Sequence, residues 1–258
     1  MSASRNRSEV HAHQAFQQQA QVLQGKDLSG RFTHIYETNL WGSDTSRSGQ
    51  GSVMEQVSGI IRQLPVLLKN VGATSLLDAP CGDFAWMPSV DLRGVRYIGA
   101  DIVPDLVARN QAQVARLGSE RNDSAQETVR ERSIYETKPD SAANYEFRLL
   151  DLTKDPLPTV DVVLCRDCLV HLSAVHIWDV IENLKRSGST WLLTTTFPEH
   201  DGFNDIEDGD WRLLNLELAP FGFPTPEALL NEGCTEGDGH YSDKSLGLWR
   251  ISELPTRP

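Results

Sequence analysis

The chain has 258 residues, of which 39% are hydrophobic, and a formal net charge of −12 from 36 acidic and 24 basic residues. This length suits one large α/β domain with a full core. No apolar run approaches the roughly 20 residues of a membrane span, the N-terminus has no apolar signal core, and the negative charge would repel a phosphate backbone. We therefore expect a cytoplasmic protein that binds neither membranes nor nucleic acid.

The four cysteines are too few for a disulfide framework in a chain of this length. Cys165 and Cys168 form one C-x-x-C pair, whereas a structural zinc site usually needs four such ligands. Cys81 and Cys234 could join this pair only through the fold. We interpret all four as reduced, mostly buried thiols.

The first 70 residues are predicted to form a helical cover segment that contributes to the site. Residues 13–24 are typical of a polar helix with a narrow apolar stripe, which suits a cover or, equally, a contact in a homo-oligomer. Residues 43–52 are almost all Ser, Thr and Gly around Arg47, and such a loop suits a carboxylate or a phosphate. A flexible surface loop is the alternative. Residues 53–70 have helical periodicity.

Residues 71–258 alternate between strand patterns and amphipathic helix patterns, as in a doubly wound parallel sheet. A charged stretch at about 118–144 is interpreted as a polar insertion in one domain. Strands are predicted at residues 74–78, 96–101, 145–151, 160–165, 191–197 and 245–251, and helices at 103–117 and 173–186.

The first of these strands ends at Asp78, and the chain then breaks at Pro80, Cys81 and Gly82. Ligands of open α/β sheets bind outside the carboxyl ends of the strands, and a carboxylate beside a glycine turn suits a ligand with positive charge and hydroxyl groups. The proline removes an N–H group where a dinucleotide enzyme would present one to a pyrophosphate. The turn therefore disfavours NAD or FAD and favours a nucleoside cofactor without phosphate.

Two further acidic residues end the next two strands. Asp101 stands 23 positions after Asp78, near the spacing at which a carboxylate accepts from both hydroxyls of a ribose. Asp151 could accept from an adenine amino group. Each could instead cap the turn or helix that follows, and for Asp101 both roles can hold together.

Together these residues resemble the class I S-adenosylmethionine-dependent methyltransferases, over about residues 76–251. Residues 76–82 stand where that family has its glycine-rich first motif, Asp101 where it has the ribose-binding acid, and residues 150–152 where it has the adenine contact. The single Gly82 departs from the two or three glycines of many members. The resemblance implies a Rossmann-like, mainly parallel, seven-stranded sheet and S-adenosylmethionine as cofactor. With Arg47 and Gly49 near the carboxylate end of this cofactor, we expect cofactor binding by Trp41, Arg47, Ser48, Gly49, Asp78, Ala79, Gly82, Asp101, Ile102, Asp151, Leu152 and Arg166.

Three shorter segments narrow the resemblance. Trp41-Gly42, residues 48–52 and residues 243–249 look like a subgroup of actinobacterial sugar O-methyltransferases that act in methylated polysaccharide synthesis. This similarity implies transfer of a methyl group to a hydroxyl of a sugar or oligosaccharide.

A sugar hydroxyl is a poor nucleophile that needs a base or a metal. Asp167 and His171 follow the fourth strand, and they would share one face if the turn were helical, so the carboxylate could orient the imidazole and raise its basicity. Capping by Asp167 and packing of His171 are the alternative.

Metal is the other way to activate the hydroxyl. Asp167 and the acidic segment 199–208 could hold Mg²⁺, with Asp167 and Asp205 as the expected ligands. This segment could instead be solvated or bind sugar hydroxyls. Trp211, Phe221 and Phe223 could stack on sugar rings, although core packing is expected for at least one of them.

The sequence thus predicts an O-methyltransferase with a sugar acceptor and a base-assisted, or also Mg²⁺-assisted, in-line displacement. Alternatives are a methyltransferase acting on a small natural product or an amine, a non-catalytic nucleoside-binding partner subunit, and a nicotinamide oxidoreductase, which the Pro-Cys-Gly turn disfavours.

Overall fold

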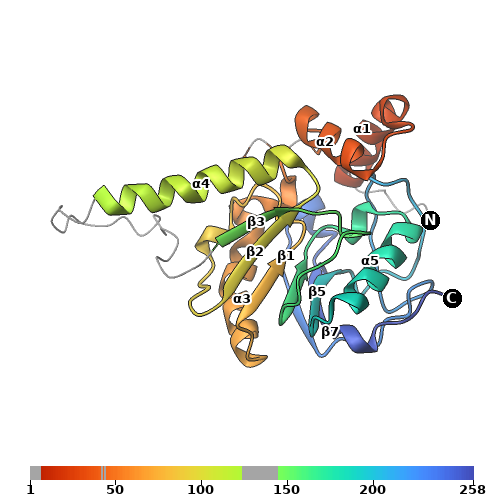
Figure 1. Ribbon diagram of the computed structural model, residues 1–258. Coiled ribbons are helices and arrows are strands. Elements are labelled where there is room, and N and C mark those ends of the chain that lie inside the picture. Colours follow the sequence, from red (N-terminus) through yellow and green to blue (C-terminus); the bar gives the residue numbers. More distant parts are fainter. Residues whose placement is uncertain (1–6, 42, 44, 124–144) are drawn as a thin grey trace.

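The computed structural model describes residues 7–41, 43, 45–123 and 145–258. Its centre is one seven-stranded sheet in the order β3-β2-β1-β4-β5-β7-β6 (Figure 1). β7 pairs antiparallel with both neighbours, and the other pairs are parallel, so the predicted mainly parallel, doubly wound sheet is confirmed. The strands are β1 Ser75–Asp78, β2 Arg96–Asp101, β3 Tyr145–Leu149, β4 Val162–Cys165, β5 Trp191–Thr196, β6 Ala228–Asn231 and β7 Ser245–Arg250.

Helices cover both faces of this sheet because successive residues of a strand point to opposite faces. Leu77 belongs to the core on the α5 side, with Ile181 of that helix. Its neighbour Leu76 belongs to the core on the opposite side, with Ile60 of α3 and Val107 of α4. The helices are α1 Arg7–Leu23, α2 Leu28–Thr38, α3 Met54–Asn70, α4 Pro104–Asp123 and α5 Ala174–Ser187.

The predicted insertion begins inside α4, which continues to Asp123, and its part at 124–144 lies outside the described residues. The sequence also missed two elements, β6 and α2. Asp27 caps the start of α2, because its Oδ1 accepts from the Gly30 N–H at 2.9 Å.

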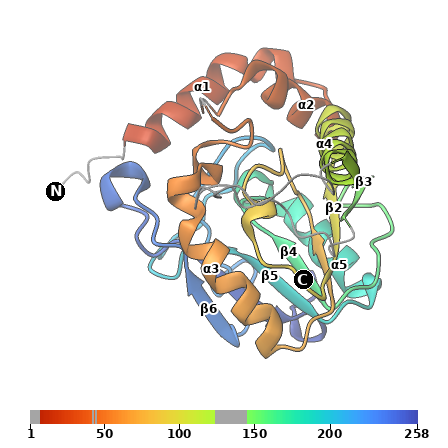
Figure 2. The same ribbon diagram turned by 90° about the vertical axis from the view of Figure 1, so that its left-hand side faces the viewer.

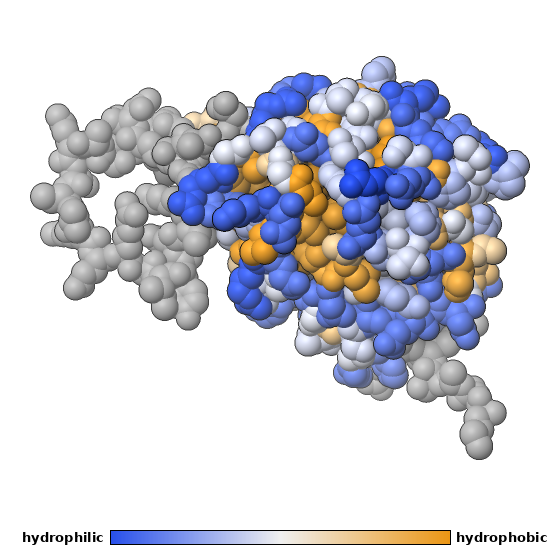
Figure 3. All heavy atoms as spheres, turned by 90° about the horizontal axis from the view of Figure 1, so that it is seen from below, coloured by the Kyte–Doolittle hydropathy of each residue, from blue (hydrophilic) through white to orange (hydrophobic). Residues whose placement is uncertain are grey.

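α1 and α2 lie together at one end of the molecule, away from the bulk of α3 and α5 (Figures 1 and 2). Figure 3 shows the opposite side, where most apolar residues gather near the centre of a largely hydrophilic surface and a smaller group lies near its right-hand edge. In the part of the chain that the structure describes, no helix has both the length and the apolar character needed to cross a bilayer.

Candidate functional site

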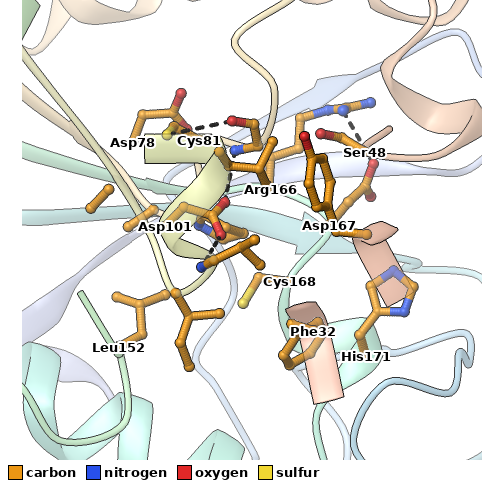
Figure 4. A pocket seen from close by; sticks show the side chains of 18 of the residues that line it. Phe32, Ser48, Asp78, Cys81, Asp101, Leu152, Arg166, Asp167, Cys168 and His171 are labelled. Atoms are coloured by element: carbon orange, nitrogen blue, oxygen red, sulfur yellow. Dashed lines mark hydrogen bonds and ion pairs between the residues drawn. The ribbon is translucent and has the colours of Figure 1, made fainter. Parts of the chain in front are cut away.

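A pocket lies between α2 and the carboxyl ends of β1, β2 and β4 (Figure 4). In the close-up, Asp78, Cys81 and Asp101 lie on one side, and Asp167, Phe32 and His171 on the other. Fourteen residues were predicted as catalytic or cofactor-binding, and the pocket brings together all of them except Gly49. These are Trp41, Arg47, Ser48, Asp78, Ala79, Gly82, Asp101, Ile102, Asp151, Leu152, Arg166, Asp167 and His171.

The turn after β1 forms the floor of the pocket. Gly82 has a φ of +54°, a conformation that glycine adopts at little cost, and its N–H donates to Asp101 Oδ2 at 3.0 Å. Ser48 lies where a β-carbon on Gly82 would point. The Ser48 Oγ accepts a hydrogen bond from the Asp83 N–H at 2.9 Å. A single glycine therefore suffices in this turn, because Gly82 is the position there that combines a positive φ with no room for a β-carbon.

Gly82→Ala is expected to weaken binding of the cofactor that the sequence predicts at this floor. The new methyl group would overlap the Ser48 hydroxyl, and the left-handed backbone would cost about 1 kcal/mol more than with glycine. Isothermal titration with S-adenosylhomocysteine measures the loss. The double variant with Ser48→Gly should recover part of the affinity, and an unchanged affinity in the single variant would contradict this account of the floor.

Two buried carboxylates flank the turn. Burial raises the pKa of Asp78 to about 7, against the hydrogen bond from the Tyr97 hydroxyl at 2.7 Å. Burial also raises the pKa of Asp101 to about 6, against hydrogen bonds from the N–H groups of Val103 and Gly82. Asp101 thus caps the chain after β2, which is one of the two roles that the sequence predicts for it, the other being ribose binding.

The serine-rich loop is tied to the floor through Asp83. Its Oδ2 accepts from Ser46 Oγ at 2.8 Å and from the Arg47 N–H at 2.9 Å. Gly49 does not line the pocket, and instead its α-carbon faces the Trp41 side chain. The loop therefore supports the wall of the pocket at Trp41 as well as its floor.

Asp151 lines the pocket and also caps the following turn. Its Oδ1 accepts from the N–H and the hydroxyl of Thr153, at 2.9 and 2.6 Å. Its Oδ2 lies 3.1 Å from Lys154 Nζ.

His171 is a buried, neutral imidazole with a fixed tautomer. Its Nδ1 lies 2.8 Å from the carbonyl oxygen of Asp210, which can only accept, so Nδ1 carries the proton and the lone pair is on Nε2. Burial lowers its pKa to about 4, against that hydrogen bond and the charge of Asp167. The Trp41 ring stacks on it with centroids 4.5 Å apart.

The predicted pairing of Asp167 with His171 is wrong. Asp167 has a φ of +49°, which takes it out of any helix, and only Leu169–His171 forms a short 3-10 turn. The two side chains therefore do not share a helical face, and the carbonyl of Asp210 orients the imidazole in place of the carboxylate.

Asp167 belongs instead to a buried group of charges. Its Oδ2 lies 2.8 Å from Lys244 Nζ and 3.2 Å from Arg166 Nη1. Burial alone would raise its pKa, but these two cations hold the pKa well below its usual range. Arg166 Nη2 also contacts Glu232 Oε2 at 2.7 Å and donates to the Gly51 carbonyl at 2.7 Å.

The predicted magnesium ligands do not come together in the pocket. Asp205 is exposed, does not line the pocket, and accepts from the N–H groups of Ala174 and Ile206. Asp167 is already neutralised by its two cations. Across residues 13–41, 43, 45–116 and 145–258, no three His, Cys, Asp or Glu side chains form a group that could hold a metal.

The predicted aromatic stacking surfaces also lie elsewhere. Phe221 and Phe223 are buried in the α5-side core, and Trp211 packs against that core. The pocket is instead walled by aromatic residues that the sequence did not single out, apart from Trp41. Phe32 and Tyr36 come from α2, and Trp86 follows the β1 turn.

Solved structures give only distant likenesses. No protein-family model and no curated protein matches the chain. The N-methyltransferase NodS from Bradyrhizobium japonicum WM9, in complex with S-adenosyl-L-homocysteine, aligns at 13% identity and a TM-score of 0.45, over 65% of this chain and 74% of its own. The magnesium protoporphyrin IX methyltransferase ChlM from Synechocystis PCC 6803, with bound S-adenosylhomocysteine, aligns at 17% identity and a TM-score of 0.39. This alignment covers 74% of this chain and 73% of the ChlM chain. The PH0226 protein from Pyrococcus horikoshii OT3 aligns at 19% identity and a TM-score of 0.39, over 57% of this chain and 60% of the PH0226 chain.

Proposed function

We propose that this protein is an S-adenosylmethionine-dependent O-methyltransferase that acts on a hydroxyl of a sugar or oligosaccharide. The observation that carries the proposal is one pocket that joins the acidic floor at Asp78 and Asp101 to the neutral base His171. A module that only binds a nucleoside would need the floor but not the base.

The floor has the chemistry to hold this cofactor. A carboxylate offers about four acceptor sites, and backbone N–H groups, among them those of Gly82 and Val103, take only part of those on Asp101, so accepting capacity remains for a ribose hydroxyl. Asp78 places a second carboxylate in the same pocket, which suits the positive charge of the cofactor. When bound, the cofactor supplies a methyl group attached to a sulfonium sulfur. The sulfur is the leaving group, and it needs no proton to leave.

Affinity for S-adenosylmethionine is expected to rise as the pH rises through about 7, where Asp78 ionises. Below that pH the buried carboxyl is protonated and neutral, and it attracts a cation only after it loses this proton. Titration calorimetry at pH values on both sides of 7 measures the rise, and Asp78→Asn should flatten it. A wild-type affinity that does not change with pH would contradict this role of Asp78.

In this proposal, His171 takes the proton of the acceptor. Since Nδ1–H donates to the Asp210 carbonyl, the Nε2 lone pair is the basic atom of the ring, and the low pKa keeps it unprotonated at neutral pH. In the transfer, the hydroxyl oxygen forms a bond to the methyl carbon, its proton moves to Nε2, and the electron pair of the C–S bond stays on sulfur. An amine acceptor would need such a base less.

Asp167 has a different part in this proposal. Because Arg166 and Lys244 keep its carboxylate ionised, it is a poor base but a permanent hydrogen-bond acceptor in the pocket. The aromatic side chains of Phe32 and Trp41 line the same pocket. A flat apolar face together with a carboxylate suits a sugar ring, which presents C–H groups on its faces and hydroxyls at its edge.

The test is methyl transfer from labelled S-adenosylmethionine to a panel of mono- and oligosaccharides, with and without EDTA. We expect label on a sugar, in an amount that EDTA does not change. Loss of label with EDTA would place a metal in the reaction. Saturable cofactor binding without any labelled sugar would overturn the sugar acceptor, and absence of cofactor binding would overturn the whole proposal.

A further inference from the structure

A short segment from Gly209 to Arg212 lies alongside the turn that carries His171. The Gly209 N–H donates to the His171 carbonyl at 2.8 Å, and the Arg212 N–H donates to the Val170 carbonyl at 3.1 Å. Between them, the Asp210 carbonyl accepts from His171 Nδ1 at 2.8 Å. This segment therefore sets the position and the tautomer of the imidazole.

The same segment is contacted by the two N-terminal helices. His13 of α1 donates from Nδ1 to Asp210 Oδ2 at 2.7 Å, and the Asp210 side chain is only 5% exposed. The α-carbon of Gly209 faces α1 and α2 so closely that an added methyl would lie 2.6 Å from Ile35 Cδ1 and 3.3 Å from Phe16 Cε2. Asp210 thus holds α1 with its side chain and His171 with its carbonyl.

We propose that His13 is a positioning residue for His171 and acts through Asp210. The inference rests on the base role proposed above for His171. The carboxylate and the carbonyl of Asp210 are joined through only Cγ, Cβ, Cα and the carbonyl carbon, so a hydrogen bond that fixes the carboxylate limits the positions that the carbonyl can take. His13 thereby makes the alignment of the base depend on α1, although none of the described side chains of α1, residues 13–23, lines the pocket.

The test follows the ring nitrogens of His171 by NMR in the full-length, ¹⁵N-labelled protein, because protonated and unprotonated imidazole nitrogens have well-separated resonances. His171→Gln identifies the signals among those of the seven histidines. His13→Ala removes the contact, whereas His13→Asn keeps an amide N–H close to the position of Nδ1. Gln17→Ala, an exposed change on the same helix, is the matched control.

We expect His13→Ala to shift the His171 signals toward a mixture of tautomers, and His13→Asn and Gln17→Ala to leave them at the wild-type positions. Thermal melting checks that each variant is folded. His13→Ala should also lower kcat by up to about 100-fold, the loss that a misplaced catalytic group can cause, with cofactor affinity unchanged. His171 signals that are identical in His13→Ala and the wild type would overturn the proposal.

The outcomes separate this inference from the proposed function. If His171→Gln keeps full turnover while His13→Ala shifts the ring signals, the base role fails and the positioning contact stands. If His171→Gln is inactive while His13→Ala leaves the ring signals unchanged, the positioning role fails and the base role stands.

Discussion

Replacing His171 by glutamine is expected to remove most methyl transfer and to leave cofactor binding intact. General-base assistance contributes about 10²–10⁴-fold to a rate, and the glutamine amide offers no basic nitrogen in place of Nε2. His171 lies across the pocket from Asp78 and Asp101, so the floor should still hold the cofactor (Figure 4). Single-turnover transfer of labelled methyl to the acceptor measures the loss, and titration with S-adenosylhomocysteine measures the affinity.

His176→Gln is the matched control for this substitution. His176 is a second, partly buried histidine a few residues further along the chain, where its Nδ1 contacts Asp208 at 2.9 Å, outside the pocket lining. We expect its turnover to equal that of the wild type. Turnover at the wild-type rate in His171→Gln would show that this imidazole takes no proton from the acceptor.

The second large effect is expected on stability, from Glu232→Gln. Glu232 Oε2 and Arg166 Nη2 lie 2.7 Å apart, and both side chains are almost fully buried, at 1% and 4% exposed. Without the negative charge of Glu232, the buried cations Arg166 and Lys244 would no longer be fully neutralised, and they are shielded from water. Breaking a buried pair costs about 3–5 kcal/mol, and we expect about 3 kcal/mol here because the amide oxygen can still accept a hydrogen bond.

Urea unfolding measures this loss, and Glu227→Gln provides the comparison. Glu227 pairs with Arg250 at 2.7 Å near the same hairpin of β6 and β7, but both side chains are close to half exposed. Exposed pairs contribute less than about 1 kcal/mol. Similar losses in the free energy of unfolding for the two variants would mean that the buried pair contributes no more than an exposed one.

The floor of the site could be predicted from the sequence because its signals are local. Asp78 and Asp101 each end a short apolar run, and the carboxyl ends of adjacent parallel strands must meet at one edge of the sheet. Gly82 marks the turn because its backbone requires a positive φ. These three residues therefore came together as predicted.

The rest of the site depends on contacts between distant parts of the chain. Asp167 was expected to pair with His171 four positions on, yet its partner Lys244 lies 77 positions away, on the approach to β7. No local pattern indicates that contact, or that the Asp210 carbonyl holds the imidazole. The positive φ of Asp167 also has no signal in the sequence, because an aspartate is compatible with either backbone conformation.

The two missed elements had weak periodic signals for a physical reason. β6 buries only Leu230 among its four residues, so it shows no clear apolar alternation. α2 carries Gly30 and the β-branched Thr33 and Ile35, which lower helix propensity. Its helical state depends on the Asp27 cap and on packing over the pocket, where Phe32 and Tyr36 contribute to the wall.

The pocket draws its lining from separate stretches of the chain, with one wall from residues 28–41, a loop from residues 47–52 and the floor from the turn after β1. The α2 part of the proposed acceptor side can therefore change without any change in the proposed cofactor floor, although Asp167 and His171 also belong to the acceptor side. Substitutions on α2 would change which acceptors enter, and the carboxylates and the glycine turn would stay as they are. Descendants of such a chain could share one methyl donor and differ in the molecules that they methylate, with their differences concentrated in the first 41 residues.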